Sequence, residues 1–417
     1  MDSKTKGAWI IHHKEKIDVI AGVQAQFDQI NFAGKCSTLL SSISQTKQAA
    51  ISASKINTLA TANGISIRVE LASLLAELER QKLISKSKTG IEVLALTSGS
   101  ILEYTSRIYE EAGPSKNENA AIELSELVSD TPALSNDVEA KISDTFQIES
   151  QSCGELIKLS SSIGFIDAET LRNGKSILYN GNLFKKDDMN KMSHILSGLS
   201  NSEVLQMKEV NTLLDTSGCL PLEDVIKITG TELFNKLHSI ALYEVNSVSN
   251  EYGEYYFVTK PSSFCKYSKT MADDAFDLAK AFVTSLTYGM TSSEYGRGRI
   301  RMIEALMNKL IAGQWVGPAT AIGEDYKILE LRGVIQTQSA KGKMYLMKLL
   351  KEDVGKLALL VIKEGVATTN VLRDLPGASI SAYEGPERNR TIRRKSLTKP
   401  LRSSISDLLD SLRTGAI

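Results

Sequence analysis

The stretch Lys55–Leu96, KINTLATANGISIRVELASLLAELERQKLISKSKTGIEVLAL, carries the clearest run of structural signals in the chain. Lys55–Ala62 predicts a short helix, and the Asn63–Gly64 pair is expected to end it because both residues tolerate the left-handed conformation. From Ile67 onward apolar residues recur at helical spacing, so a second helix capped by Ser66 should bury one face. Two apolar runs around a basic, Gly-bearing turn then predict a β-hairpin.

The same order of a helix, a break, a second helix and a hairpin recurs in Glu203–Lys260 and in Arg297–Leu350. In the first of these, Pro221 is expected near a helix start and Thr229–Gly230 at the break, after which Thr231 caps the next helix. Between the copies, Gly164–Lys186 has two Asn-Gly turns between β-like runs and predicts a small hairpin that we assign to no module.

These patterns predict a mainly α protein with small β-hairpins, of the α+β class, built from several such modules joined by helices. We expect an N-terminal helical region with the first module, an acidic helical linker with a small β element, the second module, a helix with the third module, and a basic, partly disordered tail. The corresponding ranges are 1–110, 111–200, 201–262, 263–375 and 376–417.

Composition places the chain among globular proteins. Of its 417 residues, 42% are hydrophobic and 24% charged, so a core can form and global disorder is excluded. No run of about 18 apolar residues predicts a membrane span, and Met1–Trp9 lacks the apolar stretch of a signal peptide. We therefore expect a cytoplasmic protein that does not enter membranes.

Charge is balanced over the whole chain but uneven along it. The 49 basic and 49 acidic residues give no bulk positive field, so contact with nucleic acid requires local patches. Glu110–Glu155 holds eleven acidic residues against Lys116 and Lys141, which favours docking of a basic protein partner. The stretch from Pro376 to the end has eight basic and four acidic residues and is typical of a mobile tail.

Signals for catalysis are absent from the sequence. We find no phosphate-binding GxxxxGK[ST] loop, no GxSxG elbow, no HExxH pair and no Rossmann fingerprint, which predicts a protein that is not an enzyme and takes no cofactor. The four cysteines are widely spaced without a CxxC pair, so we expect buried thiols and no metal. The adjacent His12 and His13 are expected to pack in the N-terminal region.

The Asn63–Gly64 turn, the helix from Ile67 and the hairpin at Gly90 resemble the winged helix-turn-helix superfamily, as a likeness of fold and of no single family. Many of its members insert the second helix of the motif into the major groove and set the wing on the DNA backbone. By position, the resemblance implies DNA contacts in the three modules. They are Ser66, Arg68, Ser73, Lys86 and Lys88 in the first, Thr231, Asn235 and Lys236 in the second, and Arg297, Arg299, Arg301, Lys327, Lys341 and Lys343 in the third.

Acidic residues on the first recognition-type helix, Glu70, Glu77 and Glu79, are unfavourable near phosphates and leave two hypotheses open. In the first, the chain is a non-enzymatic, tandem winged-helix protein that binds double-stranded DNA as a transcription regulator or a DNA-targeting subunit of a larger prokaryotic system, such as one for antiviral genome defence. In the second, the modules form a protein-interaction scaffold. A long N-terminal helix, Lys14–Ser44, is a candidate for homodimer formation.

Overall fold

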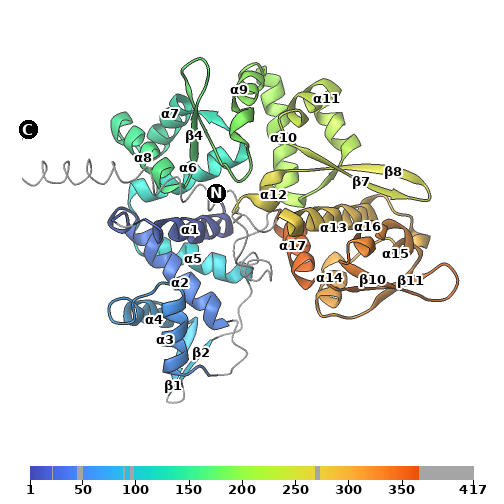
Figure 1. Cartoon of the computed structure of the whole chain (residues 1–417), viewed down its shortest axis with the longest axis horizontal. Helices are drawn as coiled ribbons and strands as arrows, with labels where there is room; N and C mark the ends of the chain where they lie inside the picture. The colour runs from blue at the N-terminus through green and yellow to red at the C-terminus, as the bar shows by residue number, and fades with distance from the viewer. Residues whose placement is uncertain (21, 45–49, 88–89, 94–97, 268–272, 366–417) are drawn as a thin grey trace, which may run out of the picture. The chain divides into compact units, whose positions relative to one another are not determined.

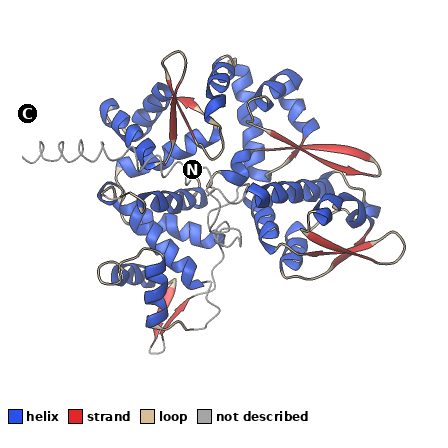
Figure 2. Cartoon of the chain, in the orientation of Figure 1, coloured by secondary structure: helices blue, strands red, loops and turns tan. Residues whose placement is uncertain are grey.

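A computed structural model describes residues 1–20, 22–44, 50–87, 90–93, 98–267 and 273–365, and the expected basic tail lies outside these ranges (Figure 1). Helices dominate, and each sheet is small and antiparallel, which confirms the α+β class (Figure 2). The described chain forms two compact units. Unit 1 holds residues 1–128 and 133–180, and unit 2 holds residues 129–132 and 181–365.

Unit 1 begins with two packed helices, where the sequence had indicated one helix over Lys14–Ser44. Helix α1 (Ser3–Ile17) ends early, and the chain reverses through the short 3-10 turn η1 (Gln24–Gln26) before α2 (Asp28–Ser44). Because Phe27 in the reversal is buried, the break is stabilised by the core. Helices α2 and α5 (Ser98–Glu111) pack against α1, whose residues from Gly7 to Lys14 are all buried.

The first module follows as predicted, with a shifted second helix. It comprises α3 (Ala53–Ala62), α4 (Leu71–Arg80), β1 (Ile84–Ser87) and β2 (Gly90–Val93). Helix α4 starts at Leu71 rather than at Ile67, and its N-cap residue is Glu70, so the predicted cap at Ser66 is wrong. The Ser66 carbonyl instead accepts the amides of both Glu70 and Leu71 in a preceding turn. Ile67 is consequently 43% exposed, whereas the expected Leu71, Leu74 and Leu78 are buried.

A complete further module occupies the region where only an acidic linker and a small hairpin were expected. Its elements are α6 (Lys116–Asp130), β3 (Ala133–Leu134), α7 (Ser135–Phe146), α8 (Ser150–Ile163), β4 (Asp167–Thr170) and β5 (Ser176–Tyr179). The predicted hairpin within Gly164–Lys186 is the β4–β5 pair of this module.

Unit 2 holds the next module in the predicted order. It contains η2 (Lys186–Asp188), α9 (Met189–Ser197), α10 (Asn201–Ser217), β6 (Leu220–Pro221), α11 (Leu222–His238), β7 (Glu244–Asn250) and β8 (Gly253–Thr259). A capping box between Ser200 and Glu203 starts α10. Gly230, with φ 70° and ψ 166°, divides α11 into two helices at the predicted Thr229–Gly230 break.

The last module completes unit 2. Its elements are α12 (Pro261–Cys265), α13 (Asp273–Thr291), η3 (Tyr295–Arg297), α14 (Ile303–Ile311), β9 (Val316–Ala319), α15 (Thr320–Asp325), α16 (Lys327–Leu331), β10 (Ile335–Ser339), β11 (Tyr345–Leu349) and α17 (Glu352–Glu364). The part of the third predicted module from Glu324 to Leu331 is divided between α15 and α16 at Tyr326, whose buried ring packs edge-on against Phe282 of α13.

One topology unites these modules, which we call repeats 1 to 4 (residues 28–93, 116–179, 201–259 and 303–349). In each, a helix leads to a short strand, two further helices and a hairpin, and the short strand pairs with the second hairpin strand. The strand orders β3-β5-β4, β6-β8-β7 and β10-β11-β9 express this rule. Repeat 1 follows it through the single bridge between Ile51 and Ile91.

Candidate nucleic-acid interface

The hairpin tip of repeat 2 projects two basic side chains. Between β4 and β5 the Leu171 amide donates to the Lys175 carbonyl at 2.8 Å, and the Asn173 side chain accepts the Lys175 amide at 3.0 Å. This turn leaves Arg172 and Lys175 exposed. The sequence predicted the hairpin but did not single out Arg172 and Lys175 as DNA contacts. The helices of repeat 2 were not predicted, so the hairpin was not assigned to a module.

The hairpin tip of repeat 4 also exposes two basic side chains. The Ala340 amide donates to the Met344 carbonyl at 2.8 Å and closes a turn that exposes Lys341 and Lys343. Within the described part of the chain, neither lysine pairs with a carboxylate. Both predicted lysines thus lie where a phosphate can reach them.

Repeat 1 has one of its two predicted tip lysines within the described residues. Its Lys86 pairs with Glu79 at 2.7 Å, and Lys88 lies outside the described residues. Ser66 and Arg68 are exposed in the turn before α4, and Ser73 is exposed in its first turn, where the Ser73 hydroxyl donates to the Glu70 carbonyl at 2.7 Å.

The carboxylates of Glu70, just before α4, and of Glu77 and Glu79 on α4 are less unfavourable for a phosphate than the sequence suggested, because each has a cationic neighbour. Glu70 binds Lys35 at 2.6 Å, Glu77 binds Arg80 at 2.7 Å, and Glu79 binds Lys86. Partial burial raises the pKa of Glu70, but the Lys35 hydrogen bond and further contacts outweigh it and lower that pKa. The negative charge on α4 is therefore largely compensated within repeat 1.

In repeat 3 the second half of α11 has exposed polar side chains that DNA could reach, whereas the hairpin tip is occupied by contacts within unit 2. Thr231 and Asn235 are exposed on the second half of α11, whereas Lys236 is shared between Glu203 at 3.1 Å and Glu232 at 3.0 Å. The hairpin tip carries Glu251 and packs on repeat 4 through the Asn250 amide, which donates to Asp325 at 3.0 Å. This tip is acidic and already engaged inside unit 2.

Arg297 holds that contact together. Its guanidinium lies 2.7 Å from Glu251 and 2.9 Å from Asp325, it stacks on Tyr252 at 4.9 Å, and the residue is 5% exposed. A side chain so enclosed is not presented to an outside phosphate. This role could not be predicted from the sequence because Glu251 and Asp325 are distant from Arg297 along the chain.

The other predicted cations of the last module differ in availability. Arg299 donates to the carbonyls of Met290 and Thr291, each at 3.1 Å, while Lys327 pairs with Glu324. Arg301 is exposed and lies over the ring of Tyr295 at 5.0 Å. Of the residues expected at the entry to the last module, Arg301 is thus the most accessible cation.

Two acidic residues of the stretch Glu110–Glu155 make contacts inside the protein. Glu118 is buried and accepts the amides of Gln29 and Ile30, and Glu126 accepts the Trp9 indole at 2.6 Å. These contacts bind unit 1 together, so reversing the charge at Glu126 would disturb the fold as well as any docking of a partner.

Cys36, Cys153 and Cys219 are buried and free, and no group of three metal-ligating side chains occurs among the described residues. Within the same ranges, no helix has the length and apolar character needed to cross a membrane. Comparisons with protein families, curated proteins and solved structures find no match to this chain.

Proposed function

We propose that the chain is a tandem winged-helix protein that binds double-stranded DNA through its exposed hairpin tips. The observation that carries the proposal is the recurrence of one helix–strand–helix–helix–hairpin topology, with two exposed basic side chains at the tip of repeat 2 and two more at the tip of repeat 4. This order of elements is the order of a winged helix-turn-helix, whose hairpin rests on the phosphate backbone.

The contacts divide into two kinds. Cations at the tips, Arg172, Lys175, Lys341 and Lys343, would bind phosphates and fix the position of the protein without reading sequence. Polar side chains on the second helix of a pair would face base edges in the major groove, where hydroxyl and amide groups discriminate bases. The exposed groups in such positions are Ser73 in repeat 1 and Thr231 and Asn235 in repeat 3, and Ser66 and Arg68 are exposed in the turn that precedes α4.

A titration of the full chain with a random-sequence duplex at several salt concentrations, followed by fluorescence anisotropy, tests the proposal. We expect log affinity to fall linearly with log salt. Reversing both tip charges in Arg172→Glu/Lys175→Glu, or in Lys341→Glu/Lys343→Glu, should weaken binding about tenfold or more and reduce the salt slope by about two, since each lost phosphate contact contributes roughly one.

Lys208→Glu is the matched control, because Lys208 is an exposed lysine on α10, away from any hairpin tip. It should change affinity by less than either tip variant. Absence of duplex binding even at low salt, or equal effects of the tip and control variants, would contradict the proposal.

A second candidate, a protein-interaction scaffold, is favoured by the apolar surface of α16. Ile328 is 49% exposed and Leu331 82% exposed on the helix of repeat 4 that a winged helix would place in the groove. Apolar side chains are suited to a protein surface rather than to phosphates. If a second copy covers this face, Leu331→Asp should convert a dimer to a monomer in light scattering, whereas Lys208→Glu should not.

A further inference from the structure

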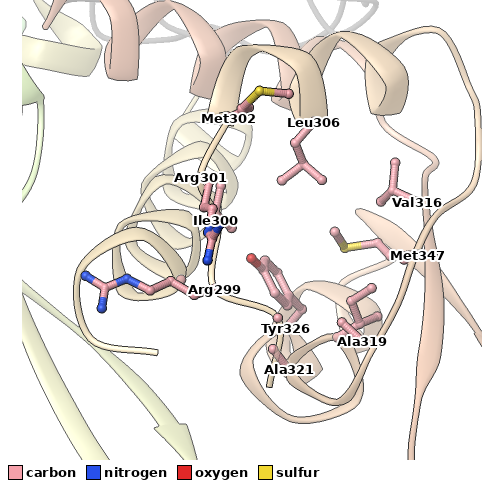
Figure 3. A pocket seen from close by; sticks show the side chains of 14 residues that line it. Arg299, Ile300, Arg301, Met302, Leu306, Val316, Ala319, Ala321, Tyr326 and Met347 are labelled. Atoms are coloured by element: carbon pink, nitrogen blue, oxygen red, sulfur yellow. The ribbon is translucent and has the colours of Figure 1, made fainter. Parts of the chain in front are cut away.

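Repeat 4 contains a small pocket where the start of α14, β9 and α15 converge (Figure 3). Its volume is about 240 Å³. Its walls are mainly apolar and include Leu306, Val316, Ala319 and Met347. Sites for drug-sized ligands occupy about 300 to 1,000 Å³, so this pocket suits a smaller group, the size of a single ring system.

A phenol supplies the polar group within these walls. Tyr326 is 4% exposed, and its hydroxyl is directed toward the segment that carries Ile300 and Arg301 (Figure 3). Burial raises the pKa of this hydroxyl, so it stays neutral and can both donate and accept. Among the described residues the hydroxyl has no hydrogen-bond partner, and because it is not one of the fully enclosed unpaired atoms, a ligand or water in the pocket can reach it.

Two arginines that line the pocket, Arg299 and Arg301, also contact the ring of Tyr295, which lies outside the pocket lining. Tyr295 is 67% exposed, and the guanidinium carbons of Arg299 and Arg301 lie 5.1 and 5.0 Å from its ring centroid. Carbonyl contacts hold Arg299 in place, whereas Arg301 has no carboxylate partner in the described parts of the chain. Exposed aromatic rings beside arginines are surfaces on which unstacked bases pack and phosphates bind.

We propose that this pocket binds one unpaired nucleobase of a nucleic acid. The base enters between the apolar walls, the Tyr326 hydroxyl bonds to its edge, the attached phosphate lies against Arg301, and a neighbouring base stacks on Tyr295. An aliphatic ligand would leave the phenol unpaired and the arginine unused, so the combination favours a planar, polar-edged group with an attached anion. The inference rests on the proposed function and adds a single-stranded or extruded nucleotide to it.

Calorimetric titration of the full chain with each of the four deoxynucleoside 5′-monophosphates tests the site directly. Deoxyribose 5-phosphate serves as the probe that lacks a base. We expect at least one nucleotide to bind about tenfold or more tightly than the sugar phosphate, since contacts to one base contribute about 1 to 3 kcal/mol, where 1.4 kcal/mol corresponds to tenfold.

Two variants test the two halves of the site. Ala319→Leu fills the pocket and Arg301→Glu removes the cation at its rim, and each should weaken nucleotide binding about tenfold or more. Lys309→Glu, an exposed charge reversal on α14 that does not line the pocket, is the control and should bind as the unchanged protein does. If circular dichroism shows that Ala319→Leu is unstable, Tyr326→Phe replaces it as the test of the pocket. This variant keeps the ring, removes the hydroxyl, and should also weaken nucleotide binding.

The outcomes separate this inference from the proposed function. Equal binding of sugar phosphate and nucleotides, no binding of any nucleotide, or unchanged affinity in folded Ala319→Leu and Tyr326→Phe would overturn the inference. Duplex binding that depends on the hairpin tips would then still stand. Nucleotide binding that both pocket variants abolish would support the inference, even where the duplex titration contradicts DNA binding by the tips.

Discussion

A single buried histidine links acidity to the stability of unit 1. The His13 ring is fully buried, stacks on Phe165 at 3.8 Å and shares a hydrogen bond with Ser125 at 2.9 Å. Burial, helped by the charge of Lys16, lowers its pKa to about 3. An exposed histidine has a pKa of about 6.5. Below this pH, His13 therefore binds a proton in the unfolded chain but stays neutral in the folded chain.

We expect His13 to reduce the free energy of unfolding by up to about 1.4 kcal/mol for each pH unit between about 6.5 and 3, and to contribute no slope above this window. In His13→Gln, urea denaturation should show lower stability at pH 7.5 but a shallower loss toward pH 5. The exposed His194→Gln should keep the steep loss. An identical slope in His13→Gln and the unchanged protein would show that another group sets the acid response.

At the scale of an element, α11 depends on one backbone conformation. Gly230 has φ 70° and ψ 166°, a backbone conformation that residues other than glycine rarely adopt. No atom lies within 4 Å of the position that a Cβ atom would take at this residue. The cost of a substitution is therefore conformational. Gly230→Ala should lower the free energy of unfolding by about 1 to 3 kcal/mol and loosen the junction between the two helices of repeat 3.

Gly174 at the hairpin tip of repeat 2 offers the comparison. It also has open space around it, but its φ of 78° falls in the left-handed region of a turn, so Gly174→Ala should cost roughly 1 kcal/mol. Chemical denaturation of both variants measures the difference. A smaller loss in Gly230→Ala than in Gly174→Ala would show that α11 adapts to the change.

At the scale of the whole molecule, a four-residue segment helps to hold unit 2 together. Lys260 is 3% exposed and lies 2.7 Å from Asp130, in the segment 129–132, and 2.9 Å from Asp215. Burial lowers the Lys260 pKa, but the two carboxylates outweigh it and raise that pKa. Asp130→Asn leaves a buried cation with one charged partner, and since Asp130 is partly exposed the loss should be about 1 to 2 kcal/mol.

Hydrogen exchange with mass spectrometry can locate this loss. Protection should fall in peptides from unit 2 in Asp130→Asn, while the exposed Asp137→Asn should leave it unchanged. Unaltered exchange in unit 2 would mean that Asp215 alone suffices for Lys260.

The sequence revealed elements whose boundaries are set locally. The break at Gly230, the hairpins of repeats 3 and 4 and the apolar face of α4 follow from turn residues and spacing. Repeat 2 was missed because its two helices meet at Gln147, a non-glycine residue with φ 51°, which leaves no Gly or Pro signal. Its first helix, α6, also buries Ser125 and Ser129, so its polar composition resembled a linker.

Part of the candidate site, like part of the fold, could be predicted from the sequence. Exposed lysines on hairpin tips, such as Lys341, depend only on the turn that carries them. The burial of Arg297 could not be predicted, because its carboxylate partners lie 46 and 28 residues away and only the folded chain brings them together.

The Arg297 contact also has a mechanical consequence. By fastening the β7–β8 hairpin to Asp325, it adds charged hydrogen bonds to the apolar core that repeats 3 and 4 already share, and a stretching force must break these bonds before the repeats can separate. Under tension, repeats 3 and 4 should therefore yield as one block, so this stretch of the chain resists load with a stiffness that neither repeat has by itself.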